Sequence, residues 1–408
     1  MSRGLGDVYK RQLLAIMKIL LANKFYYRRG GDCIYMLNLE QLLKTHGHDV
    51  AVFAMDYPEN IETEWKRYFP NEIKFTPGVG MLETFMRMFG LGEVKRKFNF
   101  LLNDFKPDVV HLNNIHTQLS PVIARLAHKR RTKVIWTLHD YKLLCPRYDC
   151  LRNGNEVCEE CFVDKHKVLE YKCMKNSNLA SMLAYKEGMK WSRKKLEGYT
   201  DVFICPSQFM YNKMAQGGFD RKKMYTLCNF IDIERTRRDS YDKEDYYCFI
   251  GRLSFEKGIE TLIEAARTLP YHLKIIGSGP LADILKEKAK GANIEFTGYK
   301  EWPEIKEIVG KARFSVVPSE WYENNPLSMI EAQCLGTPVL GANIGGIPEL
   351  IKEGVNGMCF ESRNIMDLKN KIEKMFILNV DYKQLAKSSQ IRYSSEKHYN
   401  ELLELYQQ

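Results

Sequence analysis

The chain has 408 residues, of which 45% are hydrophobic and 27% are charged, proportions typical of a folded globular protein and not of a disordered or fibrous one. This length exceeds what one ordinary hydrophobic core holds together, so we expect two domains. The net charge of +10 favours anionic partners such as phosphates, nucleotides, anionic lipid surfaces or nucleic acid, or else a solvated basic surface, and no apolar run of the sequence reaches the ~18 residues of a membrane-spanning helix.

The first predicted strand begins near Met17, and the residues before it do not match the pattern that follows. The run LLAIMKILLA is apolar, but ANKFYYRRGG comes after it instead of a small-residue cleavage site, so we interpret it as a buried strand and not as a signal peptide. The stretch DVYKRQ resembles the translation of a sequencing-library transposon adaptor. We therefore predict that residues 1–16 are a non-native or disordered extension and that the natural start is Met17.

From Met17 to about Thr137, short β-branched runs alternate with amphipathic stretches. The predicted strands are KILLAN, HDVAVFAM, PDVVHLNN and KVIWTLHD, and GGDCIYMLNLEQLLKTHGH forms a glycine-rich turn that opens into a helix. Strands that alternate with helices predict a parallel, doubly wound sheet. After a long helical segment at about 178–197, the strand DVFICPS completes a Rossmann-like domain over residues 17–205.

A cysteine-rich insertion at residues 145–175 interrupts this pattern. Cys158 and Cys161 have the spacing of a zinc knuckle, and Cys145 and Cys173 could complete four thiolates around a structural, non-catalytic zinc. Reduced thiols and a redox pair are the open alternatives. Eleven cysteines, an odd number in a long chain, argue against a secreted disulfide framework.

The second half repeats the alternation after a polar stretch at 231–245. The predicted strands are YYCFIG, HLKIIG, NIEFTG, FSVVP and PVLGA, with a helix between successive strands. We therefore predict an α/β protein of two facing Rossmann-like domains with parallel sheets, the second over residues 206–390, and a final helix at 391–408 that packs back on the first domain. In such a fold the ligand site lies in the cleft between the domains, at the carboxyl ends of the strands.

The stretch SEWYENNPLSMIEAQCLGTPV combines a helix start with two carboxylates. Asn325 suits the N-cap and Pro326 the first helical position. The first-turn amides of Leu327 and Ser328 would then form an anion site best suited to a phosphate. An ordinary capped helix is the alternative for this stretch taken alone.

Glu323 and Glu331 flank this helix start, one in the loop and one inside the helix. Their separation along the helix axis does not suit a hydrolase-type acid/base pair that flanks one bond. We therefore predict two separate hydrogen-bonding roles, on two parts of one long ligand.

Two glycine-bearing loops follow predicted strands of the second half. GRLSFEKG places Arg252 and Lys257 beside the cleft, where two cations suit a diphosphate, although a solvated basic loop is the alternative. IIGSGPLA places Gly277 and Gly279 in a tight turn. No acidic residue follows at the end of the next strand, so we interpret this turn as lying near a nucleotide and not as an NAD site.

Two features of the first half also point into the cleft. Gly31 opens the first long helix and would let a ligand approach the backbone closely, unless it only forms a tight turn. His139 lies at the carboxyl end of a strand and could orient a ligand, although a histidine there is often merely satisfied by hydrogen bonds.

Aromatic and basic residues are mixed at 84–105 and 188–199. Such segments can lie on anionic lipid headgroups, or they form a basic solvent face over an apolar packing face. No nucleic-acid-binding module is recognisable, so we expect no nucleic-acid partner.

These motifs, in this order, resemble the bacterial GT-B-fold retaining glycosyltransferases of family 4, and the resemblance covers nearly the whole chain from Met17. Its strongest marker is the E-x7-E pattern from Glu323 to Glu331 within ENNPLSMIE, combined with GRLSFEKG upstream. GGDCIYMLNLEQLLKTHGHDV resembles the first glycine loop and helix of that family, and TLHD its histidine-bearing strand end. CPR…CEEC…C resembles an insertion found in a subset of bacterial members.

The resemblance implies that the second domain binds a donor nucleotide sugar. Arg252 and Lys257 would hold its diphosphate together with the amides of Leu327 and Ser328, and Glu331 would bind the ribose hydroxyls. The residues that would border the nucleoside are Gly277, Gly279 and Tyr299.

The resemblance also implies which residues hold the transferred sugar. Glu323, with the backbone of Asn324 and Asn325, would bind sugar hydroxyls. His139 would contact the sugar from the first, acceptor-side domain, and Gly31 would lie near the phosphate or the acceptor.

The activity implied is the transfer of a hexose-type sugar from a UDP- or GDP-sugar to a glycan or lipid-linked acceptor in bacterial surface polysaccharide biosynthesis. The enzyme would be retaining and would need no catalytic metal, because arginine and lysine stabilise the departing diphosphate. A sugar-nucleotide epimerase of the same fold and a non-catalytic sugar-nucleotide-binding partner are the alternatives. We expect a cytoplasmic protein, or one peripheral on the anionic cytoplasmic face of the inner membrane.

Overall fold

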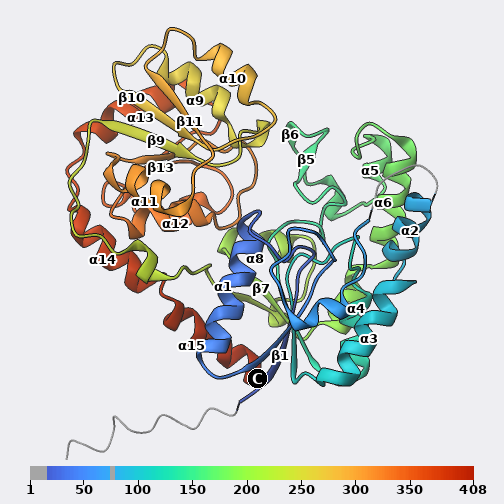
Figure 1. Cartoon of the computed structure of the whole chain (residues 1–408). Coiled ribbons are helices and arrows are strands. Elements are labelled where there is room, and N and C mark those ends of the chain that lie inside the picture. The colour runs from blue at the N-terminus through green and yellow to red at the C-terminus, as the bar shows by residue number, and fades with distance from the viewer. Residues whose placement is uncertain (1–15, 74–78) are drawn as a thin grey trace, which may run out of the picture.

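A computed structural model describes residues 16–73 and 79–408, which form two α/β domains, each built around a parallel sheet of six strands (Figure 1). This architecture confirms the predicted fold of two Rossmann-like domains. The prediction that residues 1–16 are foreign to the fold falls almost wholly outside the described residues.

The first sheet has the strand order β2-β1-β3-β4-β7-β8, and every pairing is parallel. Its strands are β1 (Lys18–Ala22), β2 (Asp49–Phe53), β3 (Val109–Leu112), β4 (Lys133–Thr137), β7 (Val202–Cys205) and β8 (Met224–Thr226). The edge strand β8 was not predicted, because its partly exposed segment MYT is not an apolar, β-branched run. The sheet therefore extends past residue 205, where we predicted that the first domain ends.

Alternate residues of the buried strands face two different helical layers. Ile19 and Leu21 of β1 pack in the cluster with α1 (Gly31–Thr45), whereas Leu20 and Ala22 pack in the cluster with the helices of the opposite face. Those helices are α3 (Glu93–Phe105) and α4 (Val122–Lys129), and α2 (Val79–Met88) precedes them in the chain. Burial on both faces is the reason why the strands are continuous apolar runs.

The cysteine-rich insertion carries little regular structure. It contains the hairpin β5 (Leu151–Arg152) with β6 (Glu156–Val157), and α5 (Lys167–Glu170). The single helix predicted at 178–197 is divided into α6 (Asn178–Lys190) and α7 (Arg193–Tyr199). The division falls at Trp191, whose buried indole donates a hydrogen bond to the Met88 carbonyl at 2.7 Å and thereby binds the chain to α2.

The second sheet has the strand order β11-β10-β9-β12-β13-β14, again all parallel. Its strands are β9 (Tyr246–Ile250), β10 (His272–Ile276), β11 (Ile294–Gly298), β12 (Ser315–Val317), β13 (Val339–Ala342) and β14 (Gly357–Phe360). Its helices are α9 (Ile259–Ala266), α10 (Ala282–Lys288), α11 (Trp302–Lys311), α12 (Leu327–Cys334), α13 (Ile365–Ile377) and α14 (Tyr382–Arg392). The sequence did not predict β14.

The last helix, α15 (Ser395–Gln407), returns to the first domain and lies beside α1 (Figure 1). Its apolar side chains join the core between α1 and the first sheet. Tyr406 lies 2.6 Å from His111 Nδ1, and His398 Nε2 lies 3.1 Å from the Tyr35 hydroxyl. Burial lowers the pKa of both histidines to about 3, so both imidazoles are neutral at physiological pH.

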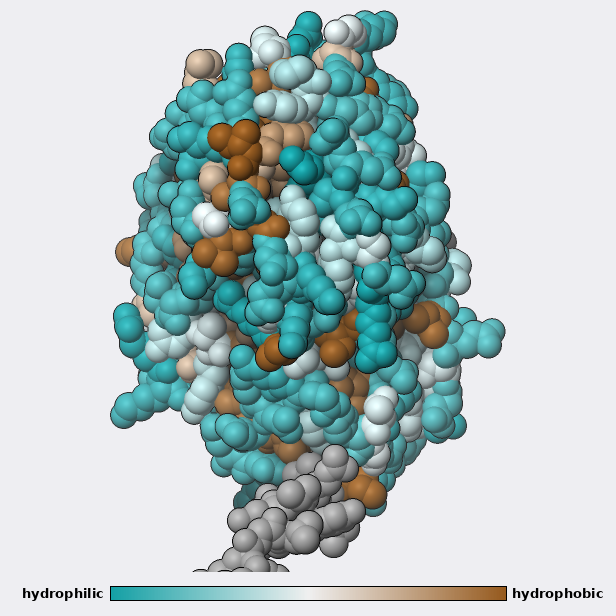
Figure 2. Space-filling view, turned by 90° about the vertical axis from the view of Figure 1, so that its left-hand side faces the viewer, coloured by the Kyte–Doolittle hydropathy of each residue, from teal (hydrophilic) through white to brown (hydrophobic). Residues whose placement is uncertain are grey.

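The surface seen from the left of Figure 1 is mostly hydrophilic, with separate hydrophobic patches (Figure 2). Across the part of the chain that the structure describes, no helix has the length and apolar character needed to cross a membrane.

Candidate active site

The two domains bring two helix starts together where the carboxyl ends of their sheets face each other. α1 begins at Gly31, and α12 begins at Leu327. A side-chain carbon added to Gly31 would lie 4.0 Å from Leu327 Cδ1, so the two helix starts are neighbours. Their free first-turn amides and positive dipole ends therefore face one region, which suits a phosphate-bearing ligand.

The start of α12 differs from the prediction in its capping. Pro326 occupies the N-cap and not the first helical position, and Asn325 does not cap the helix. Asn325 Oδ1 instead accepts a hydrogen bond from the Asn229 amide at 2.9 Å and one from the Cys228 thiol at 3.3 Å. These donors belong to the connection between the domains, which lies far away in sequence. The amides predicted to bind the anion still belong to the first turn.

Glu323, on the loop before α12, is buried beside a cation. Lys257 Nζ lies 2.5 Å from Glu323 Oε1, and Ser319 Oγ and Trp321 Nε1 each donate to the same oxygen at 2.9 Å. Burial raises the pKa of Glu323, but the charge and hydrogen bond of Lys257 outweigh burial and hold that pKa below its usual value. The carboxylate is therefore ionised. Its Oε2 makes no hydrogen bond to any residue that the structure describes, so this oxygen can accept one from a ligand.

The loops after β9 and β10 pack backbone against backbone. A side-chain carbon at Gly277, where φ is +135°, or at Gly279 would collide with the main chain of residues 251–253. These glycines therefore let the two loops approach each other and support the loop that carries Arg252. The Arg252 side chain itself is exposed.

Glu331, inside α12, is half-buried and lies within electrostatic range of two arginines. Burial raises the pKa of Glu331 to about 7, and the charges of Arg235 and Arg28 oppose that rise. Within residues 16–73 and 79–408 its carboxylate has no hydrogen bond or ion pair of its own. The Arg235 guanidinium lies 4.6 Å over the ring of Trp302. Tyr299, which we predicted to border the nucleoside, precedes Trp302 by three residues and is 70% exposed.

The first domain contributes a wall of polar side chains that follows β3 and β4. His139 Nε2 lies 2.9 Å from Asn113 Oδ1, and the His139 ring lies 4.9 Å from the ring of Tyr35. Burial lowers the pKa of His139, so the imidazole is neutral at physiological pH. The buried Asn113 Nδ2 has no partner among the described residues, which makes it a free donor beside His139.

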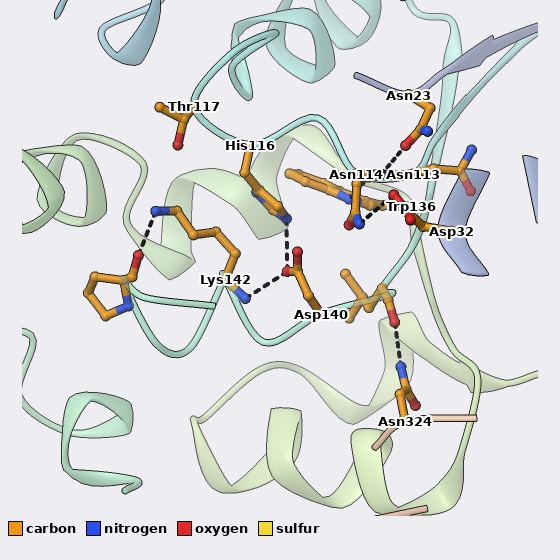
Figure 3. Close-up of polar contacts among 12 residues, drawn as sticks. Asn23, Asp32, Asn113, Asn114, His116, Thr117, Trp136, Asp140, Lys142 and Asn324 are labelled. Carbon is orange, nitrogen blue, oxygen red and sulfur yellow. Dashed lines mark hydrogen bonds and ion pairs between the residues drawn. The ribbon is translucent and has the colours of Figure 1, made fainter. Parts of the chain in front are cut away.

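Two carboxylates of this wall, Asp32 and Asp140, interact electrostatically with His139, and Figure 3 shows the polar contacts of both. Asp140 Oδ1 lies 3.4 Å from His116 Nε2, and Asp32 Oδ2 accepts a hydrogen bond from Asn114 Nδ2 at 2.9 Å. Burial raises the pKa of Asp140, but the charge and hydrogen bond of His116, together with other donors, bring it to about 2. The wall therefore presents negative charge beside a neutral imidazole.

Asn324 connects the two walls of the site directly. Its Nδ2 donates to the Leu138 carbonyl at 2.8 Å (Figure 3). Its Oδ1 accepts from Ser207 Oγ at 2.7 Å. Because both partners belong to the first domain, the Asn324 side chain holds the domains together. Only its backbone remains available for the predicted sugar contact.

Several residues of the site carry no motif that we recognised in the sequence. The main chain at Gly345 and Gly346 packs on residues 323–324 so closely that a side-chain carbon on either glycine would collide with that backbone. The Gly346 amide donates to the Glu323 carbonyl at 2.7 Å. The double glycine after the strand PVLGA was a signal that could have identified this support. No pattern in the sequence pointed to Arg28 or Arg235.

The cysteine cluster does not form a metal centre in this arrangement. All eleven cysteines are free thiols, and in the described ranges no group of three or more histidine, cysteine, aspartate or glutamate side chains is placed to hold a metal ion. The four residues predicted to bind zinc are Cys145, Cys158, Cys161 and Cys173. They therefore do not fit a preformed site, and zinc stays a prediction.

The insertion instead contacts the loop that carries Glu323. Tyr322 directly precedes Glu323, and its hydroxyl donates to Glu159 Oε1 at 2.7 Å. Lys213 Nζ lies 2.5 Å from the same oxygen, and Gln216 donates to Glu159 Oε2 at 2.7 Å. The insertion thus supports the candidate site from the first domain.

Two family models match consecutive parts of the chain. The model described as Glycosyltransferase Family 4 matches residues 29–235, and the model described as Glycosyl transferases group 1 matches residues 230–407. Together they span both domains and every residue of the site predicted from the sequence.

Similar proteins are known from several organisms. An uncharacterised 42.6 kDa protein from the cps region of Klebsiella pneumoniae is 27% identical over 353 residues, which cover 82% of this chain and 87% of that protein. A GDP-mannose-dependent alpha-mannosyltransferase of Corynebacterium glutamicum is 25% identical over 354 residues, which cover 86% of this chain and 78% of that protein.

Solved structures share the fold at low sequence identity. Sucrose-phosphate synthase from Thermosynechococcus elongatus superposes with a TM-score of 0.69 and 17% identity, over 96% of this chain and 98% of that one. The Anabaena protein HepE, solved in complex with UDP, superposes with a TM-score of 0.67 and 17% identity, over 95% of this chain and 99% of that one.

Proposed function

Because the chain belongs to glycosyltransferase family 4 and is a glycosyltransferase, we propose that it transfers a hexose-type sugar from a UDP- or GDP-sugar to a glycan or lipid-linked acceptor. The relative encoded in the cps region of Klebsiella pneumoniae supports a role in bacterial surface polysaccharide biosynthesis. The mannosyltransferase that depends on GDP-mannose and the neighbour solved with UDP support a nucleotide-sugar donor.

The observation that carries this proposal is the meeting of the α1 and α12 starts beside Lys257. The donor's diphosphate lies against the amides of Leu327 and Ser328, with the backbone at Gly31 opposite. Arg252, exposed on its loop, reaches the phosphates as a bidentate fork, and Lys257 acts as a point charge. All of these groups are positive or carry partial positive charge, so they match a dianionic ligand.

The nucleoside extends from the diphosphate along α12. Glu331 accepts hydrogen bonds from the two ribose hydroxyls, which give this half-buried carboxylate the partners that it otherwise lacks. The loop of Gly277 and Gly279, with the exposed Tyr299, borders the base.

The transferred sugar lies on the other side of the diphosphate. Glu323 Oε2 and the backbone of Asn324 and Asn325 bind its hydroxyls. His139 contacts the sugar from the first domain, where its neutral imidazole can donate or accept a hydrogen bond. The acceptor approaches along the same wall, and the first domain thus serves the acceptor while the second serves the donor.

Charge separation explains the chemistry. Cleavage of the sugar–phosphate bond leaves positive charge at the anomeric carbon and negative charge on the departing diphosphate. Lys257, Arg252 and the first-turn amides stabilise that negative charge without reorganisation. The acceptor hydroxyl attacks from the side that the phosphate leaves, and the leaving phosphate takes its proton, so the anomeric configuration is retained. Glu323 does not shuttle a proton in this scheme, because Lys257 keeps it ionised.

Purified protein incubated with UDP-, GDP- and ADP-sugars tests the proposal. A thermal-shift screen identifies the base, and chromatography of the products distinguishes the outcomes. Release of a nucleoside diphosphate with sugar transfer or hydrolysis supports the enzyme. Epimerised nucleotide sugar, or binding without turnover, would contradict it. The anomeric configuration of the product tests retention.

The same reaction tests the metal predictions. Turnover should persist in excess EDTA, because protein cations occupy the place of a divalent metal. Loss of turnover that Mg²⁺ or Mn²⁺ restores would contradict the metal-independent mechanism. Elemental analysis of the reduced protein tests the separate prediction of structural zinc, which an absence of zinc would defeat.

We also propose that the enzyme works on the cytoplasmic face of the membrane, in peripheral contact with anionic lipid. Phe85, Leu91 and Phe100 are 40%, 46% and 54% exposed in and between α2 and α3, where lysines and arginines accompany them. Exposed aromatic and apolar side chains beside basic ones suit a headgroup surface. Co-sedimentation with phosphatidylglycerol vesicles but not with phosphatidylcholine vesicles is expected. Equal recovery with both would contradict the proposal.

A further inference from the structure

A cavity of about 270 Å³ lies in the first domain between the cysteine-rich insertion and the helices α6 and α7. It is lined by none of the residues that we assign to the donor. Ligand pockets commonly measure 300–1,000 Å³, so this volume suits one part of a larger ligand.

The wall of the cavity presents more apolar than polar surface. Its larger apolar side chains are Leu143, Leu144, Phe162, Trp191, Leu196 and Phe219. All of them except Leu143 are buried, and Leu143 is half-buried. Such a wall attracts hydrocarbon through the hydrophobic effect.

The charged groups that line the cavity already have partners. Lys142 Nζ lies 2.6 Å from the Pro146 carbonyl (Figure 3) and 3.0 Å from Glu187 Oε2. Lys165 donates to the Leu143 carbonyl at 3.2 Å. The buried unpaired side-chain polar atoms of the described residues all lie elsewhere. The ammonium groups of Lys142 and Lys165 are thus held by protein partners, and an apolar group can fill the cavity without displacing them.

The lining of the cavity includes a residue of the polar wall and two exposed residues. His116 lines it, and the same imidazole contacts Asp140, which follows His139. Val163 and Met189 also line the cavity and are 93% and 53% exposed. A ligand in the cavity would thus reach the proposed acceptor side.

Exposed apolar side chains continue from Met189 along α6. Leu179, Met182 and Met189 are 56%, 40% and 53% exposed. Their spacing of three and seven residues places them on one helix face. The exposed Lys186 lies on the same face, so the approach is apolar and basic, which suits an anionic amphiphile.

We propose that this cavity binds the hydrocarbon chain of an amphiphilic acceptor, whose polar end then lies beside Asp140 and His139. This inference rests on the proposed function and narrows the acceptor to a lipid-linked molecule. The chain enters at Val163 and Met189, and its apolar surface replaces water in the cavity.

Two matched glycines allow a direct test. A side-chain carbon on Gly188, in α6, would meet only Lys165 Cδ at 3.8 Å, so a larger side chain there can enter the cavity. Gly198, in α7, has no atom within 4 Å of that position and is exposed. Gly188→Leu therefore fills the cavity, and Gly198→Leu is the control with the same gain in helix propensity.

The probe is an amphiphile whose decyl chain ends in a bromine atom, and it is used below its critical micelle concentration. Bromine quenches tryptophan fluorescence on contact, and Trp191 is the only tryptophan among the described residues that line the cavity. We expect saturable quenching in the wild type and in Gly198→Leu, and at least tenfold weaker binding in Gly188→Leu. If Gly188→Leu does not fold by circular dichroism, Ala184→Leu fills the cavity from the same helix.

The measurement needs neither donor nor turnover, so it is independent of the proposed function. Absence of saturable quenching in the wild type would overturn the proposal, as would equal binding by the wild type and the folded cavity-filling variant. With an active enzyme, Gly188→Leu should raise KM at least tenfold for an acceptor that carries a decyl chain, without changing kcat or the KM for the donor. The proposal would also be overturned if Gly188→Leu raised KM equally for the same acceptor without the decyl chain.

Discussion

Replacement of Glu331 by glutamine should stabilise the ligand-free protein and weaken nucleotide binding. Burial raises the pKa of this carboxyl from 4.5 to about 7, and no side chain that the structure describes donates a hydrogen bond to it. The ionised form is therefore unfavourable in the folded state until a ligand supplies donors. Glutamine has nearly the same shape and carries no charge.

The pKa values of Glu331 in the folded protein and in the unfolded chain set the size of the stability change and its pH dependence. Their difference of about 2.5 (7 minus 4.5) corresponds to about 3 kcal/mol. Between these pH values the folded protein binds more protons than the unfolded chain, so stability falls as pH rises. The cost of Glu331 is absent below pH 4.5 and complete above pH 7. Glu331→Gln should remove it and thereby flatten this part of the profile.

Thermal unfolding from pH 5 to pH 8.5, with and without nucleotide, measures both effects. A domain of this size gains ~2–4 °C per kcal/mol, so Glu331→Gln should raise Tm by roughly 5 °C or more at pH 8 and by much less at pH 5. The Kd for UDP or GDP should rise at least ~10-fold, because hydrogen bonds to a charged group are lost. Glu404→Gln, at an exposed carboxylate, should change neither quantity. An unchanged Tm at pH 8 together with an unchanged Kd would refute this reasoning.

Three further predictions concern other parts of the molecule. Lys257→Ala should lower transfer at least ~100-fold, and it should destabilise the donor-free protein because Glu323 loses its ion pair. Arg252→Ala should lower transfer at an unchanged Tm, because its side chain is exposed. Near-normal turnover in both variants would contradict the diphosphate assignment. Tyr322→Phe should cost about 1 kcal/mol in urea unfolding, because Glu159 keeps its contacts with Lys213 and Gln216, and an unchanged midpoint would show that the insertion does not support this loop. Acidification from pH 6.5 towards 3 should destabilise the packing of α15, because the unfolded chain protonates its histidines while folded His111 and His398 remain neutral. His398→Gln should make Tm less dependent on pH in this range. An identical pH profile would count against the neutral state of His398.

Local patterns were sufficient to predict the architecture. Ten strands of the two parallel sheets were predicted, because central strands buried on both faces are apolar runs between helical segments. Two of the four edge strands, β8 and β14, were not, because both are partly exposed and neither is a β-branched apolar run. The break at Trp191 was missed as well; the partner of its indole there, the Met88 carbonyl, lies more than a hundred residues away in the chain.

The sequence by itself determined the family of this protein and the motifs that carry its chemistry, because such motifs are short and local: GRLSFEKG, the helix start at Leu327 and the two glutamates eight positions apart. Only the tertiary structure decided how these groups are partnered. Lys257 pairs with Glu323, and Glu331 is half-buried without a hydrogen-bond donor. Asn325 bonds to the connection between the domains and does not cap the helix. Each of these outcomes depends on burial or on a partner distant in the chain, and neither quantity can be obtained from residue spacing.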